Sequence, residues 1–296
     1  SSSDTSTQAL DELAMRALAM AKAVPEDPFC GLAEVNQLAT NLPDVQSCDS
    51  FEPNAEHLND LASRAEQAAL AVDGISNSEG ASASWGLNTV AMSASNGFSQ
   101  AYANSSHSLS ISVIAGEGTE MEGDYDFTAA VFADDMESPE NLGESAGIKA
   151  TKRLNPKKVK TAEVPVIFDP RVSKSLVGHF SAAINGSTVA RGASFLKDKM
   201  GDRVFSQEVN IIDDPLRKRG LKSRPFDGEG VNTQRLNLIK DGYLNTWIMD
   251  LRSARQLGMQ TTGHASRGTS SPPSPSSSNL YLEPGKINPQ QLMKDI

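Results

Sequence analysis

The stretch SASWGLNTVAMSASNGFSQAYANSSHSLSISVIAG, residues 82–116, decides the fold of the first half of this chain. Small polar residues alternate there with apolar ones, a period of two that is typical of strands with one buried face. Asn96-Gly97 stands between two such runs and is a strong hairpin signal, because both residues tolerate the positive φ of a tight turn. A further alternating run, DYDFTAAVFA, occupies 124–133. The sequence therefore predicts an antiparallel sheet over roughly residues 82–133.

Segments with a helical spacing of apolar residues precede and follow this sheet in the sequence. Residues 4–23 and 54–72 precede it and residues 139–154 follow it. We expect the two preceding helices to cover one face of the sheet, because a sheet with one apolar face must bury it against another layer. The expected class is α+β.

The second half reads as a separate, strand-rich unit. VPVIFD (164–169) is typical of a short buried strand, and Asp169-Pro170 predicts the start of a helix that ends at Asn185-Gly186. Residues 231–250 predict two strands around the turn Asp241-Gly242. A short helix is expected over 252–259.

The basic run KATKRLNPKKVK (149–160) is interpreted as a solvated helix end followed by a linker. It contains no aromatic residue on which a nucleic-acid base could stack. We place the domain boundary at its end, which gives an N-terminal α+β domain over 1–160 and a strand-rich C-terminal domain over 161–296.

The overall charge limits the partners of the chain. The 37 acidic residues outnumber the 27 Lys and Arg and give a net charge of −10, which works against binding nucleic acid or an anionic membrane. No apolar run approaches the roughly 18 residues that span a bilayer. No signal peptide is visible at the N-terminus, so we expect a cytoplasmic protein. Cys30 and Cys48 have no metal-binding spacing and are expected as free thiols.

His179, in LVGHFSAAINGS (176–187), raises the question of a metal site on the predicted helix. A catalytic zinc ion takes about three protein ligands, often two from one helix. No histidine, cysteine or carboxylate stands four or five residues from His179. The other histidines are isolated in the sequence: His57, His107 and His264. The residues alone therefore predict no metal site.

Several long motifs resemble one known family. In the second half they are GHFSAAINGSTVARGASFL (178–196), SRPFDGEGVNTQRLNLIKDG (223–242) and ARQLGMQTTGHA (254–265). In the first half DPFCGLAE, SRAEQAALAVDGISNSEG and ANSSHSLSISVIA stand in the matching order. Together they resemble the PmbA/TldE branch of the TldD/PmbA metallopeptidases, also called modulators of DNA gyrase. Family chains extend further on both sides, so the resemblance is to an internal portion.

The resemblance implies a cytoplasmic peptidase assembled from two related subunits. The TldD-type subunit carries a His-Glu-x-x-x-His motif and the zinc, whereas the PmbA/TldE-type subunit lacks the motif. Two alignments of the helix put different residues at the three motif positions: Val177, Gly178 and Ala182, or Lys174, Ser175 and His179. In both alignments the ligand set is incomplete and the general-base glutamate is missing, so we expect no metal on this helix.

The implied role is that of a metal-free partner subunit in the maturation or degradation of peptides. Its expected partners are a TldD-type subunit, which would hold the zinc, or a second copy of itself, together with a peptide substrate. The candidate residues for the substrate groove lie in the best-matching motifs: His179, Asn185, Arg191, Asp227, Glu229 and His264. The histidines would donate to peptide carbonyls, and the arginine would meet a carboxylate. Asn185 equally suits a helix C-cap, and the two acids equally suit a turn.

The hairpin expected over 231–250 has more apolar residues than one sheet face can bury. We therefore expect a subunit interface there, with Leu244 and Trp247 at the contact. An extended peptide is expected to add to the strand edge of the same hairpin.

Two other functions stay open. An autonomous hydrolase would need other acidic groups: Asp213, Asp214, Asp227 and Glu229. Acidic loop residues of this kind also form turns. A non-catalytic interaction protein acting on gyrase-related systems is suggested by the family's name, although the charge gives direct DNA contact no support.

Overall fold

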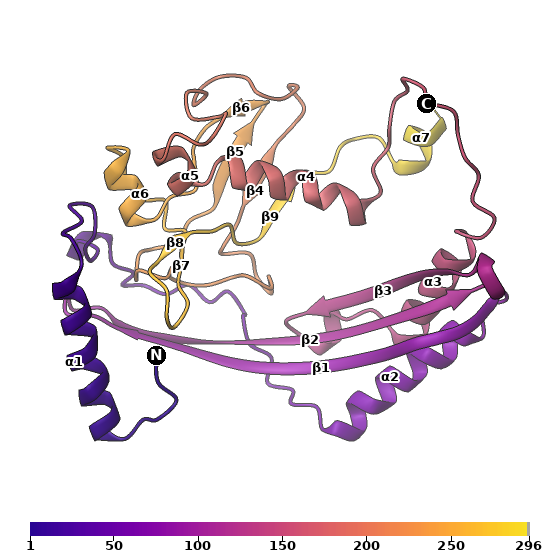
Figure 1. Cartoon of the computed structure of the whole chain (residues 1–296), viewed down its shortest axis with the longest axis horizontal. Helices are drawn as coiled ribbons and strands as arrows, with labels where there is room; N and C mark the ends of the chain where they lie inside the picture. Colours follow the sequence, from indigo (N-terminus) through magenta and orange to yellow (C-terminus); the bar gives the residue numbers. More distant parts are fainter. Residues whose placement is uncertain (295–296) are drawn as a thin grey trace.

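The alternating stretch forms a long hairpin in the computed structural model, which describes residues 1–294 (Figure 1). β1 (Ile75–Ser93) and β2 (Ser99–Ala115) pair antiparallel, and Asn96-Gly97 lies in the turn between them. β3 (Glu122–Ala130) pairs with the other edge of β2. The predicted sheet is confirmed, and it begins earlier than expected, at Ile75.

The helices that cover this sheet differ in part from those expected. α2 (Ala55–Leu70) and α3 (Pro139–Thr151) pack on one face, where alternate residues of β2 such as Leu109 and Ile111 are buried. α1 (Thr7–Ala23) buries no residue and stands beside the turn end of the hairpin (Figure 1). The expectation that the first helix covers the sheet is wrong, because α3 occupies that place.

The C-terminal half combines small sheets with short helices, as expected for an α+β chain. A sheet in the order β6-β5-β4-β9 carries its core, and the turn at Asp241-Gly242 joins β5 to β6 as predicted. The strands are β4 (Ile211–Asp213), β5 (Leu236–Lys240), β6 (Tyr243–Leu244), β7 (Ala265–Ser266), β8 (Ser274–Pro275) and β9 (Leu280–Leu282). The helices are α4 (Pro170–Ala183), α5 (Gly186–Ala190), α6 (Leu251–Gln256) and α7 (Pro289–Lys294). Single 3₁₀ turns lie at Val35–Gln37, Gly118–Glu120 and Ala133–Asp135.

Residues 164–169 do not form the predicted buried strand. No strand in the described part of the chain pairs with them, and Val164 and Val166 are 61% and 65% exposed. An apolar run of this length is buried only when another element covers it, and here it belongs to the connection between α3 and α4 (Figure 1).

The expected interface residues lie inside the chain. Leu244 is fully buried and Trp247 is 8% exposed, both in a core with Leu238, Ile239 and Ile248. The expectation that they point outward is wrong, because helices and loops of the same chain cover both faces of this small sheet. Among the large apolar residues of 231–250, Tyr243 is exposed.

A third apolar cluster joins the turn end of the hairpin to the C-terminal half. The Phe226 ring lies 5.1 Å from both the Phe98 ring and the Tyr102 ring, edge to face. Leu38 and Val231 are buried in the same cluster. The two halves are therefore packed together and not only linked through residues 152–169.

Two further sequence expectations concern the surface. Cys30 and Cys48 are exposed and free, as predicted. Within residues 1–294, none of the helices has the length and apolarity that crossing a membrane requires.

Candidate functional site

The first turn of helix α4 is bound to β3 of the N-terminal sheet, and the helix lies on the same side of this sheet as the rest of the C-terminal half (Figure 1). The Asp169 side chain accepts from the Arg171 N–H at 2.9 Å and caps the helix, with Pro170 in the first turn as predicted. The Arg171 guanidinium donates to the Asp124 carboxylate of β3 at 2.7 Å and to the Tyr125 carbonyl at 3.2 Å. This ion pair places the helix across from β3.

The residues of α4 do not fit a zinc ion. His179 is exposed, and neither alignment of the helix supplies two more ligands beside it. Throughout residues 1–294, no three His, Cys, Asp or Glu side chains gather closely enough to hold a metal ion. A zinc site takes about three protein ligands, so no chemical step through a metal follows from this chain's residues.

A groove of about 1100 Å³ runs between α4, β3, the segment 217–222 and β9. The helix lines it with Leu176, Val177 and Gly178, and the strand with Leu280–Leu282. Basic side chains gather in its lining: Lys174, Arg217, Lys218, Arg219 and Lys222. Asp135 is the carboxylate that the same lining contains. The groove is therefore basic, in a chain whose net charge is −10. We call it the basic groove.

Aromatic rings, more than carboxylates, hold these cations in place. The Arg219 guanidinium lies 3.9 Å from the centre of the Phe132 ring and also donates to Asp135 at 3.1 Å. Arg217 lies over the Tyr281 ring at 5.8 Å, and Lys174 over the Phe127 ring at 5.4 Å. A cation over a ring keeps its full charge, so the groove presents positive charge that the protein has not neutralised.

The segment 217–222 is shaped by a half-buried amide, that of Asn279. The Asn279 side chain accepts from the Lys222 N–H at 3.0 Å and donates to the Asp214 carbonyl at 2.7 Å. It also donates to the Ser223 hydroxyl at 2.8 Å. These bonds fix the cationic loop against the residues that lead into β9.

Two of the predicted groove residues lie together, but away from the basic groove. Asn185 and Arg191 line a separate cavity of about 550 Å³ at the other end of α4, with Asp250 and Ser274. The Asn185 side-chain oxygen Oδ1 accepts from the Ser187 N–H at 3.0 Å, and the side-chain amide nitrogen donates to the Pro275 carbonyl at 2.9 Å. Asn185 is thus the N-cap of α5, where the sequence suggested the C-cap of the preceding helix.

His264 lies in the core and not in a groove. The residue is 0% exposed, and its Nε2 lies 3.1 Å from the Asp213 carboxylate, which is also fully buried. Its Nδ1 lies 2.7 Å from the Thr262 carbonyl, and Asp213 accepts in addition from the Ser278 N–H at 2.8 Å. The expectation that His264 meets a peptide is wrong, since the residue is fully buried and both its ring nitrogens have partners inside the chain.

Asp227 and Glu229 organise a turn, the alternative that the sequence left open. Asp227 accepts from the Glu229 and Val231 N–H groups at 2.9 and 3.0 Å and from the Ala265 N–H at 2.9 Å. Glu229 accepts from the Leu251 N–H at 2.8 Å, at the start of α6. Burial raises the pKa of both carboxyl groups, and that of Glu229 reaches about 7.

The raised pKa of Glu229 predicts a pH-dependent stability. The folded chain holds this proton more tightly than the unfolded chain, so the stabilisation is complete below a pH of 4.5 and is lost as the pH rises through about 7. We expect the free energy of unfolding to fall by about 1 kcal/mol between about pH 6 and about pH 8, after allowing for partial exposure. Glu229→Gln should reduce that fall while keeping an acceptor for the Leu251 N–H.

Urea unfolding at several pH values measures this effect. Glu163→Gln, on the exposed connection between α3 and α4, is the matched control and should leave the pH dependence unchanged. An identical pH dependence in the Glu229→Gln and native chains would contradict the prediction.

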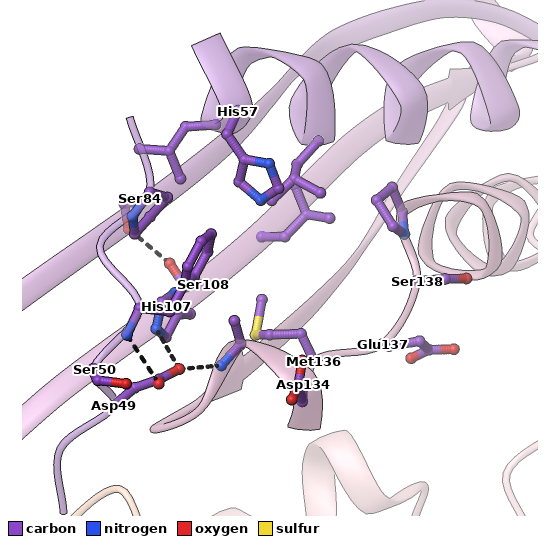
Figure 2. A pocket seen from close by; sticks show the side chains of 17 residues that line it. Asp49, Ser50, His57, Ser84, His107, Ser108, Asp134, Met136, Glu137 and Ser138 are labelled. Atoms are coloured by element: carbon purple, nitrogen blue, oxygen red, sulfur yellow. Dashed lines mark hydrogen bonds and ion pairs between the residues drawn. The ribbon is translucent and has the colours of Figure 1, made fainter. Parts of the chain in front are cut away.

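A second large cavity, of about 620 Å³, lies in the N-terminal half between α2, β2 and the start of α3 (Figure 2). His107 is buried at its floor, with Nε2 3.5 Å from the Asp49 carboxylate. Phe51 stacks on His107 at 6.2 Å, and Asp49 accepts from the Ala133 N–H at 2.9 Å. This cluster anchors the segment before α2 to the sheet.

Sequence reasoning missed the basic groove. A signal was present, because RKRGLK (217–222) places four cations within six residues. The sequence does not show that this run faces α4 and β9, which are separated from each other by about a hundred residues and meet only in the folded chain.

Comparison with known families shows what the whole chain is similar to. Residues 161–296 match the model described as PmbA/TldA metallopeptidase C-terminal domain, and residues 48–154 match the central domain of the same family. The chain is 39% identical over 266 residues to Metalloprotease PmbA of Escherichia coli O157:H7. It is equally similar to the Metalloprotease PmbA homolog of Haemophilus influenzae. Both alignments cover 90% of this chain, which spans 59% of the length of these relatives.

Solved structures share the fold at lower sequence identity. A putative modulator of DNA gyrase from Bacteroides thetaiotaomicron matches with a TM-score of 0.88 and 24% identity, over 99% of this chain and 65% of that one. TldE from Thermococcus kodakarensis matches with a TM-score of 0.81 and 22% identity, over 99% of this chain and 66% of that one.

Proposed function

The chain belongs to the PmbA/TldD metallopeptidase family, and from this premise we propose that it is the metal-free subunit of a cytoplasmic two-subunit peptidase. In this role it binds peptide, and a TldD-type partner holds the zinc and carries out hydrolysis. The assembly would serve the maturation or degradation of peptides.

One observation carries the proposal. Helix α4 lines the basic groove, yet its three motif positions carry no ligand set for zinc in either alignment. The groove is large enough for a peptide segment, and backbone of β9 forms one of its walls. A groove of this kind can hold a peptide without acting on it.

The acidic groups expected for an autonomous hydrolase have structural tasks. Asp213 and Asp227 are buried acceptors, and Asp214 accepts from the Leu216 N–H at 3.0 Å within a turn. A general base must reach a substrate proton, which these bonds disfavour. The partner-subunit role is therefore the better-supported function.

Zinc content and peptide hydrolysis test the proposal together. We expect the purified chain to hold substoichiometric zinc and to leave short peptides intact. Mixed with a TldD-type partner, it should raise the partner's hydrolysis rate, and it should do nothing for a partner whose motif glutamate is replaced. Zinc-dependent hydrolysis by this chain alone would instead establish an autonomous peptidase.

Assembly is tested by light scattering on the same mixtures. The proposal expects a complex with the TldD-type partner or a dimer of this chain. A strict monomer in both samples would reject the partner-subunit role.

A further inference from the structure

β9 is an edge strand whose outer side is free. Among residues 1–294 it pairs only with β4, in the order β6-β5-β4-β9. The Glu283 N–H donates to Asn210 at 2.9 Å and the Asp214 N–H donates to Asn279 at 3.1 Å. These bonds turn the backbone of residues 279, 281 and 283 toward β4, so that the N–H and C=O groups of Leu280 and Leu282 point away from it.

The opposite edge of this sheet is not available in the same way. β6 is covered by the segment 201–204, where the Leu244 N–H donates to the Asp202 carbonyl at 3.0 Å and the Gly201 N–H donates to the Leu244 carbonyl at 2.7 Å. The expectation that a peptide adds to the 231–250 hairpin is therefore wrong. No hydrogen bond within residues 1–294 is made by the outward groups of Leu280 and Leu282, which line the basic groove.

The cations of the groove stand along this free edge. Arg217 covers the Tyr281 ring of β9, and the ammonium groups of Lys218 and Lys222 have no bonded partner within residues 1–294. Five cations face one carboxylate, Asp135, which Arg219 already binds. An occupant that brings carboxylates would neutralise charge that the chain leaves unpaired.

We propose, on the basis of the function proposed above, that the basic groove selects an extended acidic peptide segment that adds as a strand to β9. Its backbone would bond with Leu280 and Leu282. Alternate side chains of a strand lie on one face about 7 Å apart, so acids two residues apart would meet Lys174, Arg217 and Lys222. A nucleic acid could use the cations, but its backbone has no amides to pair with the strand.

Fluorescence anisotropy with defined peptides tests the inference. The probe is a labelled, N-acetylated and C-amidated hexapeptide of alternating Glu and Val. One control peptide has Lys at every Glu, and another keeps Glu but has N-methylated amides. We expect the acidic peptide to bind at least about tenfold more tightly than either control and to weaken with added salt.

Charge reversal in the chain localises the effect. The double variant Lys218→Glu, Lys222→Glu should weaken binding at least about tenfold. Lys157→Glu, Lys158→Glu makes the same change in net charge on the exposed connection, and should change binding less than about twofold. Leu282→Pro removes an outward N–H without touching the ladder to β4, and should also weaken binding. Circular dichroism checks that each variant is folded.

The outcomes separate this inference from the proposed function. The proposed selectivity for acidic peptides would be overturned if the Glu and Lys peptides bind equally well. It would also be overturned if the two double variants lose the same amount of affinity for the acidic peptide. Either result would stand even if the chain still stimulates a TldD-type partner. Tight competition by a single-stranded oligonucleotide, together with undiminished binding of the N-methylated peptide, would assign the groove to nucleic acid instead. If the chain binds the acidic peptide but does not stimulate a TldD-type partner, the partner-subunit role is rejected. The selectivity of the basic groove for acidic peptides is then still supported.

Discussion

Gly143→Ala is expected to lower the free energy of unfolding by about 3 kcal/mol or more. Gly143 lies in α3 where this helix crosses α2. A Cβ at this position would lie 2.1 Å from the Ala65 carbonyl oxygen, 2.9 Å from the Ala69 nitrogen and 3.0 Å from the Ala68 Cβ. The first two are backbone atoms of a helix, which cannot move aside without shifting α2 off the sheet.

The gain in helix propensity cannot offset this clash. Alanine is favoured over glycine in a helix interior by only about 1 kcal/mol. Gly147 makes a similar approach one turn later, since its Cβ would lie 2.6 Å from the Val72 side chain. The two glycines thus allow α2 and α3 to pack closely. This close packing buries Leu109 and Ile111 of β2 beneath the two helices.

Urea unfolding followed by circular dichroism measures the effect, with Gly178→Ala as the matched control. Gly178 also lies within a helix, α4, but no atom stands within 4 Å of a Cβ added there. We expect this control to leave stability unchanged or to raise it by up to about 1 kcal/mol. If Gly143→Ala unfolds at the same urea concentration as the native chain, the close packing of α2 and α3 is wrong.

Phe226→Ala is expected to cost about 3–5 kcal/mol. Phe226 is 2% exposed and makes edge-to-face contacts with Phe98 and Tyr102, both from the hairpin. Its removal would leave a cavity between the turn end of the hairpin and the C-terminal half. Gly230 packs closely against this cluster, since a Cβ at that position would lie 2.9 Å from the Phe98 ring.

Two measurements test whether the loss of stability in Phe226→Ala comes from its buried contacts and not merely from removing a large side chain. Phe195→Ala, at a position that is 81% exposed, should change the free energy of unfolding by less than about 0.5 kcal/mol. Amide exchange should rise at residues 94–102 in Phe226→Ala and stay low in β3, which this cluster does not touch. Unchanged exchange at the hairpin turn would show that the two halves are not joined through Phe226.

The candidate site could be predicted only in part. The resemblance of the motifs and the missing ligand set on the 170–185 helix were readable, because both depend on residue identity alone. The positions of the six proposed groove residues were not. His264 and Asp227 satisfy buried backbone and side-chain groups, and Asn185 caps α5. A matching motif marks residues that a fold requires as readily as residues that meet a substrate.

The sequence by itself determined the local structure and the family. Asn96-Gly97, Asp169-Pro170 and Asp241-Gly242 produced the turns and the helix start that they predict, because φ preferences and side-chain caps act within a few residues. The period of two over 82–116 likewise requires only that one face be buried.

The tertiary structure alone decided which surfaces are covered. The apolar run 164–169 is exposed while Leu244 and Trp247 are buried, although all three looked alike as apolar positions in strands. The free edge of β9 and the cations of 217–222 meet for the same reason, through hydrogen bonds of Asn279 to residues far from it in the sequence. Burial and electrostatic potential depend on neighbours in space, and a sequence pattern specifies only neighbours along the chain.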